Sequence, residues 1–123
     1  MESKKTVILG ASANPARYAY MAADLLAEYG HEFVPVGIKS GNVFGKTILD
    51  LRQRPAIHDV HTVTMYIGPR NQPEWYDYII SLKPSRIIFN PGSENSEFEK
   101  LLKTHHIEPV FACTLVMLRT GQY

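Results

Sequence analysis

The sequence predicts an α/β domain in which a mainly parallel sheet of five or six strands carries helices on both faces. Short apolar runs rich in β-branched residues alternate with segments whose apolar residues recur at the helical period. The pattern begins with an apolar strand, a tight turn at Gly10–Asn14, an amphipathic helix and a second apolar run at Phe33–Val36. Because this order forms a parallel β-α-β unit, we expect a doubly wound, Rossmann-like sheet.

The length and composition predict a single domain that spans residues 1–123, since this length is usual for a single hydrophobic core. The one cysteine excludes an internal disulfide, and we find neither a leader nor an apolar run that would span a membrane. We therefore expect a cytoplasmic protein. The net charge of +1 gives no reason to expect nucleic acid or a membrane surface as partner. The seven tyrosines allow a homodimer but do not locate an interface.

The first helix is predicted to begin at Asn14, because asparagine caps free N–H groups and Pro15 at the first helical position loses no hydrogen bond. Gly30 ends it. The apolar face expected to pack on the sheet consists of Tyr18, Ala22, Leu25, Leu26 and Tyr29. The start of this helix then directs unpaired N–H groups and a positive dipole end towards a ligand.

The same periodicities predict the remaining elements. Strands are expected at Lys5–Gly10, Phe33–Gly37, Thr62–Ile67, Arg86–Phe89 and Pro109–Ala112, with a weaker candidate at Lys46–Leu51. Further helices are expected at Pro73–Leu82, after a capping box at Ser96–Glu99, and at Cys113–Arg119. The glycine-rich segment Ile38–Gly45 predicts a mobile loop over the carboxyl edge of the sheet.

Ligands of parallel sheets lie outside the carboxyl ends of the strands, so the first turn is the leading candidate site. It keeps only the first glycine of the dinucleotide fingerprint, at Gly10, but the small residues after it let a pyrophosphate approach the backbone. Ser12 adds a hydroxyl donor, and Arg17 can reach a phosphate. An ordinary turn of an α/β protein followed by a solvated arginine is the alternative interpretation.

The end of the second strand indicates which nucleotide fits. An NAD site requires an acidic residue there to bind the ribose hydroxyls, but the chain continues as Val36-Gly37-Ile38-Lys39. Lys39 suits a ribose phosphate, either the 3′-phosphate of coenzyme A or the 2′-phosphate of NADP. A lysine in a flexible loop, without a ligand, is the alternative.

Several segments together resemble a known family: VILGASANPARYAY, LLAEYGHEFVPV, NPGSENSEFEKLL and VFACTLVML. The chain is similar to the small CoA-binding proteins, which in turn resemble the nucleotide-binding domain of the succinyl-CoA synthetase α-chain. The resemblance covers nearly the whole chain. Two segments depart from the usual family pattern, Val36–Lys39 and Ile67–Arg70.

The resemblance implies that coenzyme A or an acyl-CoA, a small-molecule nucleotide ligand, binds at the carboxyl edge of the sheet. The implied pyrophosphate site is formed by Gly10, Ala11, Ser12, Asn14 and Arg17. The adenosine and its ribose phosphate are implied to meet Val36 and Lys39. The segments implied to lie along the adenine or pantetheine are Ile67, Gly68, Asn90, Pro91 and Gly92.

Reactive side chains are sparse. His58 and His61 lie beside Asp59 in an irregular stretch, and the adjacent His105 and His106 point in different directions, so we expect no metal site. Glutamates after the fifth strand suit the dipole of a helix start better than catalysis. We therefore expect binding without catalysis.

Cys113 follows the last strand where a helix is predicted to begin, and this placement makes a thiol more reactive. A mixed disulfide with the CoA thiol is one hypothesis, and a small core residue is the alternative. Two other functions stay open: an NADP-binding enzyme or sensor, and an interaction module with a vestigial nucleotide site.

Overall fold

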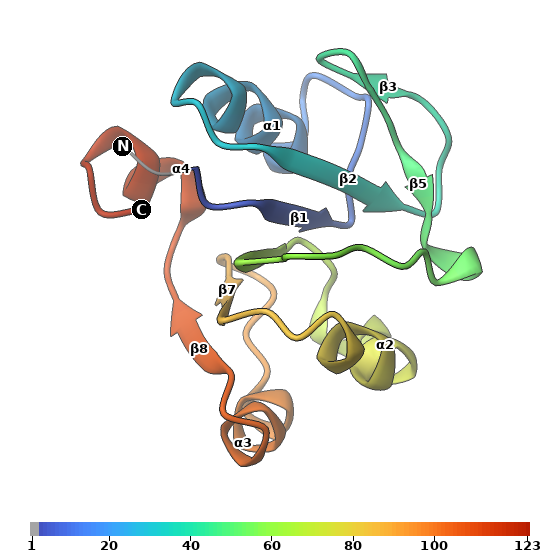
Figure 1. Ribbon diagram of the computed structural model, residues 1–123, viewed down its shortest axis with the longest axis vertical. Coiled ribbons are helices and arrows are strands. Elements are labelled where there is room, and N and C mark those ends of the chain that lie inside the picture. The colour runs from blue at the N-terminus through green and yellow to red at the C-terminus, as the bar shows by residue number, and fades with distance from the viewer. Residues whose placement is uncertain (1–2) are drawn as a thin grey trace.

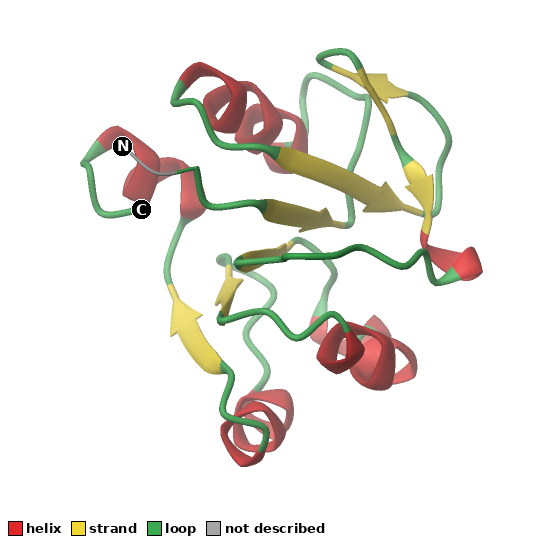
Figure 2. Ribbon diagram, viewed as in Figure 1, coloured by secondary structure: helices red, strands yellow, loops and turns green. Residues whose placement is uncertain are grey.

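The computed structural model describes residues 3–123, and it confirms the predicted fold class (Figures 1 and 2). The main sheet contains β1 (Thr6–Leu9), β2 (Phe33–Gly37), β5 (Leu49–Asp50), β6 (Thr62–Met65), β7 (Arg86–Phe89) and β8 (Glu108–Phe111). Its order is β5-β2-β1-β6-β7-β8, and every pair of neighbours is parallel. Counted along the chain this is 3-2-1-4-5-6, the order of doubly wound dinucleotide-binding sheets.

Helices cover both faces of the sheet, as Figure 2 shows. They are α1 (Tyr18–Glu28), α2 (Tyr76–Ser81), α3 (Ser96–Thr104) and α4 (Thr114–Arg119), with 3₁₀ turns at Leu51–Gln53, Pro69–Asn71 and Pro73–Trp75. One core joins α2 and α3 to the sheet, and the other joins α1 and α4 to the opposite face. The central strand shows why both faces must be covered, because Val7 and Leu9 enter the first core and Ile8 the second.

The first helix begins later than the sequence predicts. Asn14 caps only a turn: its Oδ1 accepts from Ala16 N at 3.0 Å, whereas the N-cap of α1 is Arg17. The face against the sheet includes Ala22, Leu25 and Leu26 as expected, but Tyr18 and Tyr29, at the ends of the helix, are 68% and 40% exposed. Alanines at 19 and 23 complete the buried face, and their small side chains let α1 lie close to the strands.

Two other predicted boundaries change. Asn95, not Ser96, caps α3, because its Oδ1 accepts from Phe98 N at 3.0 Å. The helix predicted over Pro73–Leu82 is divided into a 3₁₀ turn and the shorter α2.

The segment predicted as a loop at Ile38–Gly45 carries one strand of an antiparallel hairpin, β3 (Asn42–Val43) with β4 (Lys46–Thr47). The weak strand candidate at Lys46–Leu51 therefore contributes both β4 and the edge strand β5. The hairpin packs on the first turn, since a Cβ at Gly41 would lie 2.8 Å from the Cβ of Ala13. No helix within residues 3–123 is long and apolar enough to cross a bilayer.

Candidate nucleotide-binding cleft

A cleft of about 610 Å³ crosses the carboxyl edge of the sheet. Its walls come from the segments that follow five neighbouring strands: Gly10–Ser12, Gly37–Lys39, Leu51, Tyr66–Ile67 and Pro91–Ser93, together with Arg17–Ala19, Asn71 and Glu74–Trp75. The chain leaves β1 towards β2 on one side and later returns to β6 on the other. The cleft therefore spans the position where strand order reverses, which is the usual ligand site of such sheets.

The structure brings most of the predicted site residues together. Eight of them line the cleft: Gly10, Ala11, Ser12, Arg17, Lys39, Ile67, Pro91 and Gly92. Four do not lie on its wall: Asn14, Val36, Gly68 and Asn90. Three of these four residues support the wall from outside the cleft. Asn14 and Val36 hydrogen-bond to residues of the first turn, and Asn90 holds the start of the segment that follows β7.

The first turn is tied to the end of β2 by its own backbone. Both Gly10 N and Ala11 N donate to the carbonyl oxygen of Val36, at 2.9 and 3.0 Å. These two N–H groups are therefore already paired, whereas the sequence predicted unpaired N–H groups in this region. Within residues 3–123 the next two, of Ser12 and Ala13, donate to no protein group. The Ser12 hydroxyl accepts from Asn14 N at 3.0 Å and keeps its own proton to donate.

Two glycines make this close approach between the turn and β2 feasible. Gly10 has φ +93°, in the region that favours glycine, and a Cβ there would lie 3.1 Å from Ile67 Cγ1. A Cβ at Gly37 would lie 2.7 Å from the carbonyl oxygen of Ala11, a backbone atom that cannot move independently. Gly37 thus sets the distance between the first turn and the loop that carries Lys39.

The cleft carries two cations whose charges are not neutralised by any described residue. Arg17 and Lys39 are exposed, and neither pairs with a carboxylate in the described part of the chain. Arg17 caps α1 without a side-chain hydrogen bond, so the first N–H groups of the helix also face outward, beside Tyr18 and Ala19 on the wall. Glu74 is the one carboxylate among the described lining residues. The arrangement suits a ligand with two separated anionic groups.

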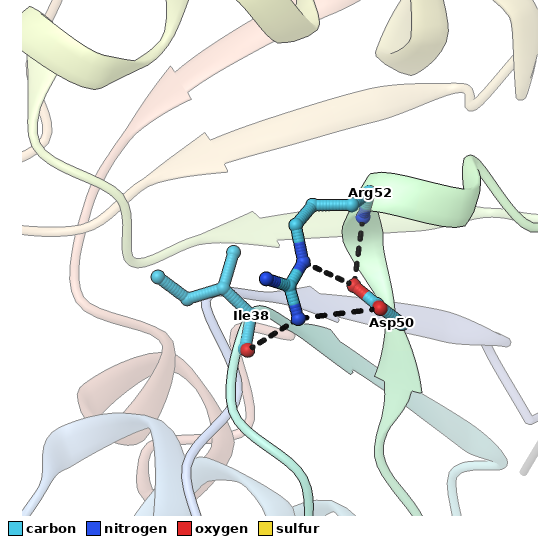
Figure 3. A network of polar contacts seen from close by, with 3 residues as sticks. All are labelled: Ile38, Asp50 and Arg52. Carbon is cyan, nitrogen blue, oxygen red and sulfur yellow. Dashed lines mark hydrogen bonds and ion pairs between the residues drawn. The ribbon is translucent and has the colours of Figure 1, made fainter.

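Figure 3 shows how the loop after β2 is held. Asp50 accepts from Arg52 N at 2.9 Å and from Arg52 Nε at 3.0 Å, and the guanidinium also donates to the carbonyl oxygen of Ile38 at 3.3 Å. The side-chain hydrogen bond from Arg52 is the main reason that the pKa of Asp50 is lowered. Arg52 is thus engaged in supporting the residue next to Lys39.

Asn90 is buried behind the cleft, and its amide group is fully used. Its Nδ2 donates to Thr64 Oγ1 at 2.7 Å and to Met65 O at 2.9 Å. Its Oδ1 accepts from Thr114 N at 2.8 Å. The side chain therefore joins β6, β7 and α4 and fixes the position of Pro91, which follows it on the wall.

Tyr66 lines the cleft, but its hydroxyl is buried and has no hydrogen-bond partner among the described residues. Burial raises the pKa of Tyr66 to about 12, so the hydroxyl stays protonated at neutral pH. The hydroxyls of Thr64 and Thr114 oppose this shift in part without reaching hydrogen-bond geometry. The ring, and not the hydroxyl, is what Tyr66 offers the cleft.

The structure provides no reactive cluster in the region it describes. Cys113 is half-buried before α4 and lies off the cleft wall. Within residues 3–123 no group of three or more histidine, cysteine, aspartate or glutamate side chains is placed to hold a metal ion.

Several wall residues were not predicted from the sequence. Asn71, Glu74 and Trp75 come from the two 3₁₀ turns between β6 and α2, a segment that the sequence predicted as a loop and a longer helix. The Gly68-Pro69 pair marked the end of the strand at the correct edge, but it carried no information on how the chain turns back over the cleft.

Three solved structures show the same fold. An uncharacterised protein is 56% identical over 100% of both chains, with a TM-score of 0.96. Prb, described as the PH1109 protein redesigned for binding, is 19% identical over 98% of this chain and 84% of its own, with a TM-score of 0.83. A protein from Thermus thermophilus is 24% identical over 98% and 91% of the two chains, with a TM-score of 0.82. No curated protein matches the chain.

The 3-2-1-4-5-6 sheet, with a cleft at the reversal of strand order, defines a Rossmann-like ligand-binding domain. The model of the CoA binding domain matches residues 4–119, nearly the whole chain. The protein belongs to this CoA-binding family, which confirms the resemblance found in the sequence.

Proposed function

We propose that the cleft binds coenzyme A or an acyl-CoA and that the chain itself performs no reaction on it. The pyrophosphate lies against the first turn, where Ser12 donates through its N–H and hydroxyl and Arg17 supplies a charge. Lys39 binds the 3′-phosphate of the ribose. The pantetheine follows Ile67 and Pro91 along the cleft.

The observation that carries this proposal is the placement, on one cleft at the reversal of strand order, of two cations that pair with no carboxylate in residues 3–123. Arg17 lies at the start of α1, and Lys39 follows β2, so the two belong to different strand ends. A nucleotide with both a pyrophosphate and a ribose phosphate satisfies both charges. NAD lacks the ribose phosphate, and no carboxylate ends β2 to bind its ribose hydroxyls.

Thermal unfolding in the presence of CoA, dephospho-CoA, NAD and NADP at equal excess tests the proposal. A ligand at about 100 times its dissociation constant stabilises the fold by about 2.7 kcal/mol, a shift of several degrees for a domain of this size. We expect CoA to give this shift and dephospho-CoA, which lacks the 3′-phosphate, to give a smaller one.

The other outcomes identify the competing functions. Stabilisation by NADP alone would indicate an NADP-binding enzyme or sensor, because Lys39 suits a 2′-phosphate equally well. Absence of any shift would contradict the proposal and favour an interaction module whose nucleotide site is vestigial.

A further inference from the structure

Gln72 is a fully buried polar residue between the two loops that follow β6 and β7. Its Nε2 donates to the carbonyl oxygen of Ile67 at 2.8 Å and to that of Ser93, also at 2.8 Å. One amide nitrogen therefore bridges backbone atoms that are 26 positions apart in sequence. Both acceptors belong to residues that line the cleft.

The other atom of the Gln72 amide is fixed as well. Its Oε1 accepts from Asn95 Nδ2 at 2.9 Å, so the side chain uses both donors and its oxygen. Asn95 also donates to Tyr76 Oη at 2.8 Å and caps α3 through its Oδ1. The orientation of the Gln72 amide is thus set by Asn95, which is itself held by the start of α3 and by Tyr76 of α2.

We propose that Gln72 is a positioning residue that sets the spacing between the loop at Ile67 and the loop at Pro91–Ser93, and through them the site of the pantetheine half of the ligand. The inference rests on the proposed function for the identity of that ligand. No other side chain of the described residues hydrogen-bonds to the carbonyls of both loops. Loss of the amide leaves the part-buried carbonyl of Ile67 and the buried carbonyl of Ser93 without this donor, and we expect the loops to move towards water in response.

Among the described residues the side chain of Gln72 makes no hydrogen bond to the loop that carries Lys39, which is held separately by Arg52. We therefore expect a substitution of Gln72 to change the binding of the pantetheine half of the ligand and not of the nucleoside half. Adenosine 3′,5′-bisphosphate carries the nucleoside end of CoA without pantetheine, so comparison of the two ligands separates positioning of the pantetheine loops from general damage to the cleft.

The experiment measures the affinity of both ligands for the wild type and for Gln72→Met, which keeps the length of the side chain and removes its amide. We expect CoA to bind about tenfold or more weakly, as the loss of a buried hydrogen-bonding group implies, and adenosine 3′,5′-bisphosphate to bind within about twofold of wild type. Equal weakening of both ligands, or of neither, would overturn the inference.

Asn95→Asp is a milder second variant in case Gln72→Met does not fold. Its carboxylate can still cap α3 but cannot donate to Gln72 Oε1, so we expect the same selective loss of CoA affinity, smaller in size. Thr6→Val is the matched control, because it removes a buried hydroxyl at the opposite edge of the sheet and leaves both loops unchanged.

Amide hydrogen exchange on the protein without ligand separates the inference from the proposed function. We expect exchange to rise in residues 67–72 and 91–95 of Gln72→Met but not of Thr6→Val. If wild type fails to bind CoA while exchange rises in both loops, the proposed function fails and the positioning role stands. If wild type binds CoA and exchange in the loops is unchanged, the positioning role fails.

Discussion

At the amino edge of the sheet Arg86 is 9% exposed, whereas at the carboxyl edge Arg17 and Lys39 are exposed. The Nε of Arg86 donates to Thr62 Oγ1 at 2.8 Å, and its guanidinium carbon lies 4.5 Å from the centre of the Tyr123 ring. The amino edge thus engages its cation with groups of the same chain. The carboxyl edge leaves Arg17 and Lys39 exposed, without a carboxylate partner in residues 3–123.

The neighbouring polar groups also differ between the two edges. At the amino edge Thr6 and Tyr123 share a hydrogen bond through their hydroxyls, and His31 Nδ1 accepts from Lys4 N at 2.9 Å. At the carboxyl edge the N–H groups of Ser12 and Ala13 have no protein partner among the described residues. Charge by itself does not identify a binding site. What distinguishes the two edges is burial: Arg86 is enclosed by Thr62 and Tyr123, although its Nη2 has no hydrogen-bond partner among the described residues, whereas Arg17 and Lys39 are exposed.

The largest expected effect follows from Arg17. Arg17→Ala should weaken CoA binding about tenfold to hundredfold, because a hydrogen bond to a charged group contributes about 1.5–3 kcal/mol. The melting temperature without ligand should not change, since the side chain is exposed. Titration calorimetry measures the affinity, with Arg119→Ala, an exposed arginine outside the cleft, as control. An unchanged affinity would show that the pyrophosphate lies elsewhere.

Gly37→Ala should damage both fold and site. Its Cβ would meet the Ala11 carbonyl oxygen at 2.7 Å, so the first turn must move, at a cost of about 1–3 kcal/mol in the free energy of unfolding. Urea denaturation measures this cost, and calorimetry should show weaker CoA binding. Gly68→Ala is the control, because nothing lies within 4 Å of a Cβ there and its φ of −62° suits any residue. Equal effects of the two substitutions would contradict the geometry.

Acid should destabilise the amino edge. Burial is the main cause that lowers the pKa of His31 and of His61, and the charges of Lys4 and Arg86 add to it. In the folded protein the imidazoles therefore take up protons at a lower pH than in the unfolded chain, where they do so near pH 6.5. The unfolded state then binds more protons, so the free energy of unfolding falls as the pH falls below about 6.5.

Melting temperatures measured between pH 7.5 and pH 5 test this dependence. The variant with both His31→Gln and His61→Gln should show a flatter profile than wild type. His58→Gln, at an exposed position, should follow wild type. A double variant as steep as wild type would assign the acid sensitivity to other groups.

The smallest effect is expected at Tyr66. Tyr66→Phe removes a buried hydroxyl that has no partner among residues 3–123, so stability should stay within about 0.5 kcal/mol of wild type or rise. Tyr78→Phe, by contrast, removes a donor to Pro55 O at 2.6 Å and should cost about 1 kcal/mol. Urea denaturation compares the two. A larger loss at Tyr66 would show that its hydroxyl has a partner in solution.

Much of the fold could be predicted from the sequence, because the inner strands β1, β2 and β7 are buried on both faces and appear as apolar runs, whereas the edge strands β5 and β8 are only partly buried. Phe33–Gly37 and Arg86–Phe89 have the predicted bounds. Helix starts were predicted less well. Asparagine and serine can cap a turn or a helix, and the choice at Asn14 and Asn95 depends on which N–H groups lie within reach.

The sequence by itself determined a parallel sheet and the segments that end its strands, because hydrophobic periodicity and turn residues act over a few positions. It also placed Arg17 and Lys39 at the carboxyl edge of the sheet, where the structure has them. Only the tertiary structure decided that Val36 pairs the first two donors of the turn, that Asn90 joins three elements and that Gln72 bridges two loops. Each of these depends on a partner far away in sequence, whose approach is set by the packing of the whole domain.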